Sequence, residues 1–155
     1  MLTPAQANSY FFWKLPAAWW TGVRVTALDL ESCTTQVRYQ WINQNPFRSM
    51  FWAVQGMAAE IATGMLLSNM FKAAQLETSM LVIANEATFT KKAVGRIRFS
   101  CTQAAAITTV IEQLKSSSSP QTLWLIAEGV DEQGDVVASF KFHWSFKKRN
   151  HGNTI

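Results

Sequence analysis

The sequence has little charge and few of the side chains that attack substrates or bind metals. Of its 155 residues, 15% are charged and 48% are hydrophobic, and only two are cysteine and two histidine. So few charges favour self-association of a domain with one sizeable core. Because the cysteines and histidines are scattered without ligand spacing, we expect no metal site and no cofactor.

Signals for nucleophilic catalysis and for membrane insertion are missing as well. Cys33 and Cys101 have no histidine beside them, and no Gly-x-Ser-x-Gly motif occurs. We expect both thiols to be reduced and buried. No signal-peptide pattern is present, and Glu60 interrupts the one long apolar segment, residues 49–71. The sequence therefore predicts a cytoplasmic protein that does not insert into membranes.

Positive charge is in modest excess, with a net charge of +4. Much of it lies in two groups, at residues 91–98 and 147–149. These groups are either solvated strand ends or a site that attracts a phosphate-bearing ligand, and the sequence leaves both open. Because neither a zinc-knuckle spacing nor a glycine-aromatic RNA-binding signature is present, we expect no nucleic-acid partner.

The periodicity of hydrophobic residues predicts an α+β fold. Strand patterns cover residues 23–30, 35–42, 80–90, 95–102, 121–130 and 136–146, and helical patterns cover 49–71 and 103–115. In the second strand, Val37, Tyr39 and Trp41 share one face. Short connections favour an antiparallel sheet, which can wrap one central helix. Outer strands left free for pairing favour a homodimer or a dimer of dimers.

We expect a single domain over residues 1–155, with an N-terminal aromatic helical arm at residues 1–21 and a disordered tail at 150–155. Thr3 and Pro4 are signals for a helix start, and Pro16 is expected to stop that helix. The arm has one lysine and no basic face. We therefore expect it to pack against the body or a second subunit rather than a membrane.

Glu60 is the only charged residue in the predicted helix over residues 49–71, which Ser49 is expected to cap. A carboxylate in such a segment costs several kcal/mol unless it is paired, protonated or hydrated in a cleft. Gly56 and Gly64 lie one turn to either side on the same face, which indicates that something passes close to the backbone. The alternative is a structural ion pair of Glu60 with Arg38 or Arg98.

Residues 45–51, NPFRSMF, resemble the start of the central helix in hotdog-fold acyl-CoA thioesterases. Their pattern is Asn-x-x-Gly-[Ser/Thr]-Met-[His/Phe/Tyr], with an acidic residue nine positions beyond the last, which here is Glu60. Residues 87–95 and 144–147 resemble an uncharacterised hotdog group related to the phenylacetyl-CoA type. The resemblance covers roughly residues 5–149. Arg48 replaces the glycine of the pattern, and Phe51-Trp52-Ala53 replaces a common His-Gly-Gly.

This resemblance implies a hotdog fold of about six strands around one central helix, and hydrolysis of acyl-CoA or acyl-carrier thioesters. In that reading Glu60 is the general base and Asn45, from the facing subunit, orients the water or the thioester. The groups expected to bind the carbonyl and the substrate are Phe51, Trp52, Gln55 and Ser49, the first two through free backbone N–H groups. Phosphates of coenzyme A would meet Lys91, Lys92 and Arg96.

Other interpretations of the same residues remain open. Asn45 before a proline is an ordinary turn residue, and a lysine pair at a strand end is usually just solvated. Because Phe51 and Trp52 replace His-Gly, the protein is alternatively a non-catalytic module that binds an acyl thioester or another apolar ligand. A hotdog dehydratase would need a histidine at the helix start, and neither His143 nor His151 is placed there.

Overall fold

The computed structural model describes residues 1–149. Its helices are α1 (Pro4–Lys14), α2 (Pro16–Trp20), the 3-10 helix η1 (Trp41–Asn43), α3 (Trp52–Ala73) and α4 (Ala104–Ser116). Its strands are β1 (Arg24–Leu28), β2 (Cys33–Arg38), β3 (Thr78–Phe89), β4 (Arg96–Cys101), β5 (Gln121–Val130) and β6 (Val136–Lys148). The expected tail, residues 150–155, and His151 lie outside the described residues.

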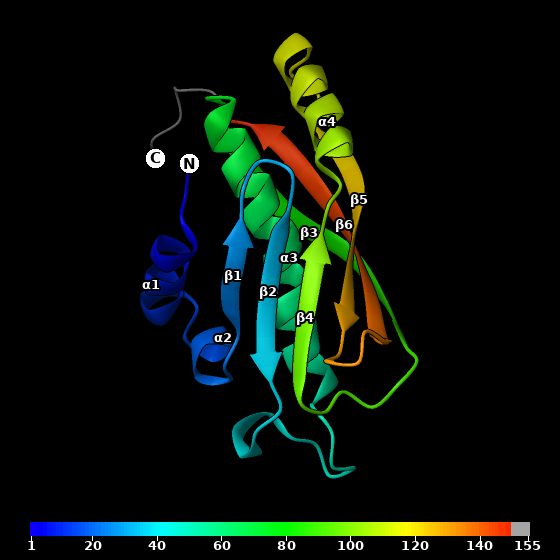
Figure 1. Ribbon diagram of the computed structural model, residues 1–155. Coiled ribbons are helices and arrows are strands. Elements are labelled where there is room, and N and C mark those ends of the chain that lie inside the picture. The colour runs from blue at the N-terminus through cyan, green and yellow to red at the C-terminus, as the bar shows by residue number, and fades with distance from the viewer. Residues whose placement is uncertain (150–155) are drawn as a thin grey trace.

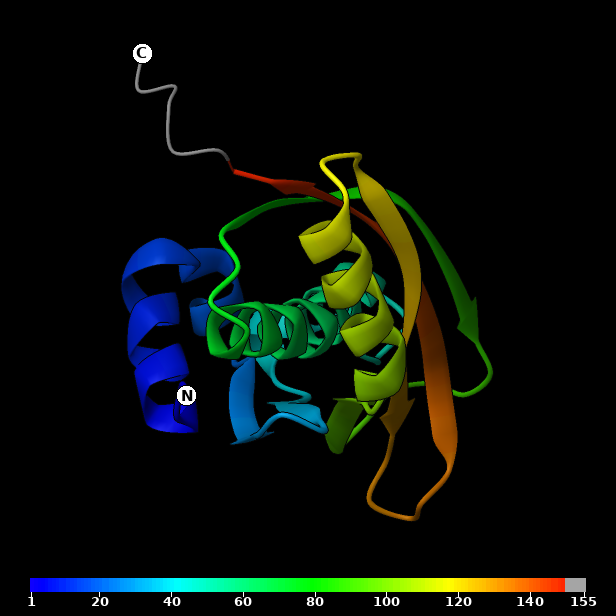
Figure 2. The same cartoon turned by 90° about the horizontal axis from the view of Figure 1, so that it is seen from above.

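The six strands form one antiparallel sheet in the order β1-β2-β4-β5-β6-β3 (Figure 1). Seen from above, the sheet curves around α3, which runs along its concave side (Figure 2). The predicted α+β fold with one long central helix is therefore confirmed. β1 and β3 are the two outer strands, and β3 pairs only with β6 over its whole length.

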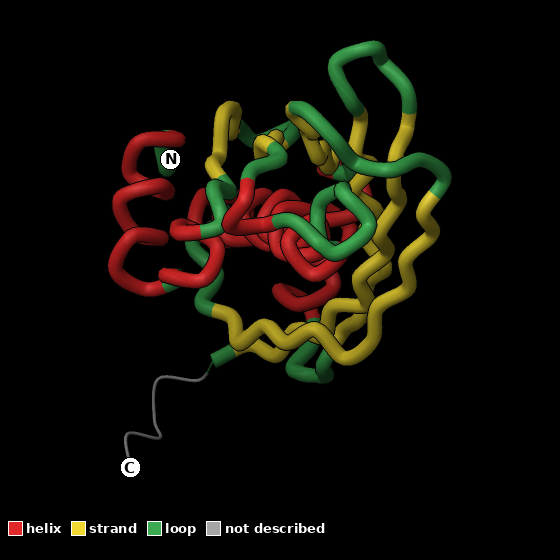
Figure 3. Tube along the Cα trace, turned by 90° about the horizontal axis from the view of Figure 1, so that it is seen from below, coloured by secondary structure: helices red, strands yellow, loops and turns green. Residues whose placement is uncertain are grey.

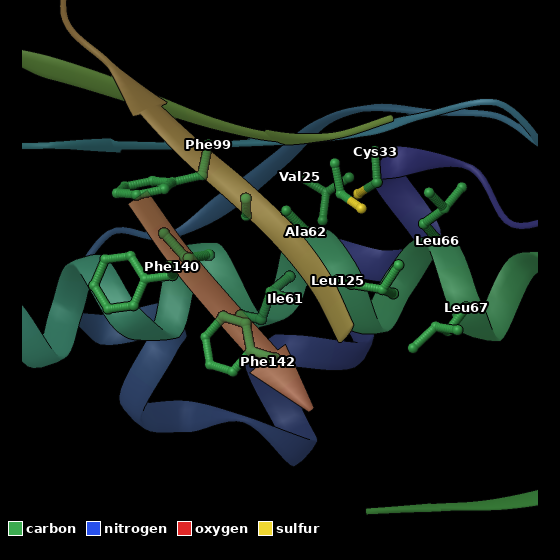
Figure 4. Close-up of a cluster of buried hydrophobic side chains, with 14 of the residues drawn as sticks. Val25, Cys33, Ile61, Ala62, Leu66, Leu67, Phe99, Leu125, Phe140 and Phe142 are labelled. Atoms are coloured by element: carbon green, nitrogen blue, oxygen red, sulfur yellow. The ribbon is translucent and has the colours of Figure 1, made fainter. Parts of the chain in front are cut away.

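Aromatic side chains of β6 fill the space between the sheet and α3 (Figure 4). A Cβ atom at Gly56 would lie 3.4 Å from the Phe140 ring, and one at Gly64 would lie 3.4 Å from Trp144. The segment that passes these two glycines is therefore the row of β6 rings, at a distance where an added Cβ would make ordinary van der Waals contact. The small side chains let the rings pack directly against the helix backbone.

Two buried hydrogen bonds fix α3 on the sheet. The Thr35 hydroxyl of β2 donates to the Ala58 carbonyl at 2.8 Å. The Trp144 indole N–H donates to the Thr63 hydroxyl at 3.1 Å. Because these bonds satisfy buried polar groups, they set the position of the helix at a net gain of about 1 kcal/mol each.

The N-terminal arm packs against the edge strand β1, as expected of a segment that contacts the body. Ala7 and Phe11 of α1 are buried. The Asn8 side chain both donates to the Val25 carbonyl and accepts from the Val25 N–H, each at 2.9 Å. It therefore satisfies the free edge of β1 as a neighbouring strand would. α1 ends at Lys14, before Pro16, as expected. Pro16 then begins α2, because proline also suits the first turn of a helix.

The predicted second strand is too long. β2 ends at Arg38, and the Asn43 amide donates to the carbonyls of Arg38 and Thr21 at 2.8 and 2.9 Å. These bonds fold residues 41–43 into η1. Trp41 consequently points away from the face it was expected to share with Val37, and 82% of it is exposed.

Within the described residues, no helix combines the length and the apolar character that a membrane crossing requires. The thiols of Cys33 and Cys101 are free and buried, as predicted. These residues lie opposite each other on β2 and β4.

We predict that Gly129→Ala destabilises the protein by about 1–3 kcal/mol, because overpacking forces neighbouring atoms to move. Gly129 lies opposite Phe99, and an added Cβ would come within 2.4 Å of that ring. The free energy of unfolding, measured in urea, checks this. Gly64→Ala is the matched control, since its Cβ has room at 3.4 Å and alanine favours a helix. Equal unfolding midpoints for the two variants would contradict the prediction.

Candidate functional site

The loop before α3 is held by one asparagine. The Asn45 carbonyl oxygen Oδ1 accepts from the Phe47 N–H at 2.8 Å and from the Ser49 N–H at 3.3 Å. Its Nδ2 donates to the Ser49 hydroxyl at 3.1 Å and to the Met50 carbonyl at 3.4 Å. Asn45 therefore uses its side chain to shape the turn, as the ordinary interpretation of an Asn-Pro turn predicts.

The first turn of α3 has no side-chain cap. Ser49, predicted as the cap, bonds to Asn45 instead, and Phe51 occupies the N-cap position without a capping hydrogen bond. The prediction that Ser49 caps the helix is therefore wrong. The reason is that α3 begins three residues later than expected, beyond the reach of this hydroxyl.

One of the two predicted carbonyl-binding N–H groups is occupied. The Phe51 N–H donates to the Asn43 carbonyl at 2.8 Å, so it is not free as expected. Among the described residues, the N–H groups of Trp52 and Ala53 have no hydrogen-bond partner. They stand at the positive end of the helix dipole, where they favour an anionic oxygen.

A cavity of about 530 Å³ opens beside this helix start. Its lining includes Asn45, Phe47, Ser49, Phe51, Trp52, Gln55, Phe89, Lys91 and Lys92. Gln55 is 96% buried, since its exposed fraction is 4%, and its Nε2 donates to the Met50 carbonyl at 3.2 Å. Its Oε1 is buried without a hydrogen-bond partner. An orphaned acceptor in a cavity wall is costly unless a ligand or water donates to it.

Arg48 differs from the thioesterase helix-start pattern in its side chain but not in its backbone conformation. Arg48 has a φ of +59°, in the left-handed region that glycine adopts freely. The thioesterase pattern has glycine at this position. The loop thus keeps the conformation that the pattern implies although the residue differs, at a cost of about 1–2 kcal/mol.

Glu60 lies two turns farther along α3, between Gly56 and Gly64 on the face that also meets the Phe140 and Trp144 rings of β6. Its side chain is exposed in the single chain, and no ion pair with Arg38 or Arg98 occurs within the described residues. Partial desolvation by the apolar helix around it raises the pKa of the Glu60 carboxyl. Eight residues of helix separate it from Trp52, which is about 12 Å along the axis.

The predicted phosphate-binding cations already have partners. The Lys91 ammonium donates to Asp131 at 2.6 Å and to Asp135 at 2.7 Å, and these bonds raise the pKa of Lys91. Lys92 donates to the Phe47 carbonyl at 3.0 Å. The Arg96 Nε lies 4.0 Å from Glu132 and is buried without a hydrogen bond. Lys92 alone lines the cavity with an ammonium that no carboxylate neutralises among the described residues.

Other chemistries find little support in the described part of the chain. No cluster of three or more His, Cys, Asp or Glu side chains could hold a metal ion there. Burial raises the pKa of the Cys33 thiol to about 12, which disfavours the nucleophilic thiolate. His143 stacks on Trp124 with ring centres 4.5 Å apart, away from the helix start.

The unpaired Ala53 N–H and the unpartnered Gln55 Oε1 were not among the features predicted from the sequence. The signal that could have identified Ala53 is its place in the first turn, where N–H groups lack partners. The orphaned Oε1 of Gln55 depends on packing and carries no sequence signal.

We predict that Arg48→Gly leaves stability unchanged or raises it by up to about 1 kcal/mol, whereas Arg48→Val lowers it by more than about 1 kcal/mol. Glycine relieves the left-handed strain but loses more entropy on folding, while a β-branched residue worsens the strain. Thermal unfolding of both variants checks this. A valine variant as stable as the glycine variant would contradict the conformation described here.

Solved structures similar to this chain share its fold over nearly the whole length. One is a Pseudomonas aeruginosa protein of unknown function, PA5026, named "Probable Thioesterase", with 21% identity, a TM-score of 0.81, and coverage of 96% of this chain and 99% of that chain. Another is the Haemophilus influenzae thioesterase HI1161, with 11% identity, a TM-score of 0.74, and coverage of 99% and 96%. A third is a mutant form of the Pseudomonas aeruginosa thioesterase PA1618, with 13% identity, a TM-score of 0.75, and 96% coverage of both chains.

These likenesses establish the hotdog fold that the sequence predicts. A search among curated proteins finds no match to this chain. A family model described as a domain of unknown function, DUF4442, matches residues 5–146. Because that match covers most of the sequence, the chain belongs to the DUF4442 family.

Proposed function

We propose that the protein hydrolyses acyl thioesters of coenzyme A or of an acyl carrier, with Glu60 as the general base. The observation that carries the proposal is the helix start of α3. There Trp52, whose N–H is unpaired, lines a cavity of about 530 Å³ together with Gln55, whose Oε1 has no hydrogen-bond partner. The unpaired N–H of Ala53 follows one residue farther along the helix. The closer relation to the phenylacetyl-CoA type remains a prediction.

The two N–H groups are suited to the thioester carbonyl. When water attacks, the carbonyl oxygen gains negative charge, and donors at a helix N-terminus stabilise that charge without reorganising. Gln55 Oε1 accepts a hydrogen bond from the attacking water or from an amide N–H of the substrate. Asn45 then acts by holding the loop that presents these groups, and a direct contact with the thioester remains a prediction.

Glu60 removes a proton from water as the new carbon–oxygen bond forms, and the thiol leaves with a proton. A carboxyl whose pKa is raised toward neutrality is a better base than an ordinary one. Because the carboxyl lies about 12 Å from the N–H groups of its own chain, it cannot act on a carbonyl bound there. We therefore propose that Glu60 serves the helix start of a second protomer.

A homodimer would supply that arrangement. β3 is a twelve-residue outer strand, and exposed Leu81, Ile83 and Phe89 accompany its unpaired edge. A long apolar edge of this kind normally pairs with another strand. Pairing of two β3 strands about a two-fold axis would also bring the two α3 helices, each with an exposed Glu60, closer to each other.

For the substrate, we propose that Lys92 meets a phosphate at the mouth of the cavity, while Lys91 and Arg96 mainly hold the neighbouring hairpin. The apolar walls around Phe47, Phe51 and Phe89 suit an acyl chain. A cytoplasmic site of action remains part of the proposal.

We predict that Glu60→Gln lowers kcat/KM for acyl-CoA hydrolysis by about 10²–10⁴-fold, because the amide cannot accept the proton. Release of free thiol from a panel of acyl-CoA esters measures this, with Glu112→Gln on the exposed side of α4 as the control. The wild-type rate should rise with pH through a pKa above the usual carboxyl range, since only ionised Glu60 is active. Equal rates for Glu60→Gln and wild type would remove Glu60 from the mechanism. Binding without thiol release in the wild type would favour the non-catalytic module.

We also predict that Trp52→Pro lowers kcat/KM by about 10²–10³-fold relative to Trp52→Ala, because it deletes one carbonyl donor. Proline suits the first helical position, and Phe51 before it has φ −59° and ψ 132°, which a residue before proline favours.

Mixing unfolded Trp52→Pro and Glu60→Gln chains and refolding them tests whether the site is shared between two protomers. Heterodimers should restore about a quarter of wild-type activity, since one of their two sites has both groups. No recovery would mean that donor and base belong to one chain.

A further inference from the structure

We propose that one end of the molecule binds the surface of anionic lipid bilayers. This end, which we call the aromatic end, consists of Trp13, Leu15, Trp20, Trp41 and Ile42. The inference does not depend on thioester hydrolysis, and it concerns a surface that the candidate site does not use.

The five side chains come from three segments that contact one another in series, α1 with α2 and α2 with η1. Trp13 and Leu15 end α1, Trp20 ends α2, and Trp41 and Ile42 begin η1. Figure 1 shows α2 and η1 at the lower end of the molecule, and Figure 3 views that end from below. The Asn43 amide bonds to the Thr21 carbonyl at 2.9 Å, so η1 and α2 are in direct contact.

The three tryptophans are among the most exposed apolar side chains of the described residues. Trp41 is 82% exposed, Trp13 76% and Trp20 67%, and Leu15 and Ile42 are also exposed. Exposing so much indole and aliphatic surface to water is unfavourable unless something covers it. The arm itself is already packed through Ala7, Phe11 and Ala18 on its opposite side. The internal packing of the arm therefore does not use the exposed side chains.

The charges around the aromatic end are of one sign. Residues 1–28 and 32–59 contain no Asp or Glu. Their cations are Lys14, Arg38 and Arg48, together with Arg24, whose guanidinium already donates to the Trp19 and Val23 carbonyls. In the nearby β5–β6 hairpin, Asp131 and Asp135 contact Lys91, and Glu132 lies 4.0 Å from the Arg96 Nε. A surface with cations and no free carboxylate is complementary to anionic headgroups.

This composition favours a lipid surface over the other possible occupants. A second copy of the chain, related by a two-fold axis, would bring cations against cations. Single-stranded nucleic acid would use the indoles for stacking, but it has no use for Leu15 and Ile42. Indole rings with aliphatic neighbours suit the boundary between headgroups and acyl chains, where tryptophan is enriched. This binding is peripheral, since no helix among residues 1–149 has the length and apolar character to cross a bilayer.

The experiment is flotation of the full chain with vesicles of phosphatidylcholine, with and without about 30% phosphatidylglycerol, at low and at high salt. Wild type should float with anionic vesicles, and high salt should release it. Trp41→Ser should weaken binding about tenfold, because the variant lacks the indole ring that would be buried in the bilayer. Lys14→Gln should weaken it about fivefold, the effect of one cation near the surface. Trp124→Ala, at an exposed tryptophan on β5, is the matched control and should bind as wild type does.

Several results would overturn the proposal. Wild type that stays with the aqueous fraction at low salt would do so, as would equal binding by wild type and a Trp13→Ser/Trp20→Ser/Trp41→Ser variant whose circular dichroism matches wild type. Loss of self-association in that variant, with no vesicle binding by wild type, would assign the surface to a second copy. Tighter binding of wild type to a single-stranded oligonucleotide than to anionic vesicles would assign it to nucleic acid.

Discussion

The packing of α3 inside the curved sheet is the constraint on which the rest of the molecule depends. Ala58, Ala62 and Leu66 are fully buried against the strands, whereas Glu60 reaches solvent. An apolar helix normally has cover all round. Here the exposed Glu60 lies on an otherwise apolar helix, and β3 leaves one edge of the sheet unpaired. The proposed second protomer would pair with the β3 edge and would also complete the candidate site at Glu60.

The start of α3 shows how local structure leaves reactive groups free. Asn45 and Ser49 hydrogen-bond to each other and to the loop, so neither side chain caps the helix. An uncapped helix start costs about 1 kcal/mol. The left-handed Arg48 adds strain in the same loop. Costs concentrated at one loop, beside a cavity with an orphaned acceptor, are typical of a binding site rather than of a purely structural turn.

The sequence predicted most of the fold because its periodicity is local. The alternating side chains of β6 and the unbroken apolar run of α3 each identify an element without reference to the rest of the chain. The errors lie where distant residues decide. Asn43 ends β2 early by bonding to Thr21, and Lys91 is neutralised by Asp131, forty residues away. Glu60 was identified as the lone charge of the helix, but which neighbours it faces depends on packing that the sequence does not encode locally.

The aromatic end and the candidate site share one short segment of chain. The Phe51 N–H bonds to the Asn43 carbonyl at 2.8 Å, so η1 and the helix start are held together. Phe47, on the loop between them, is exposed and also lines the cavity. A bilayer contacted by Trp41 would therefore lie near the mouth of that cavity. An acyl chain could then pass from lipid to cavity along apolar side chains, without crossing bulk water. This geometry would favour thioesters with long apolar chains, since these partition into bilayers at about 0.8 kcal/mol per methylene group.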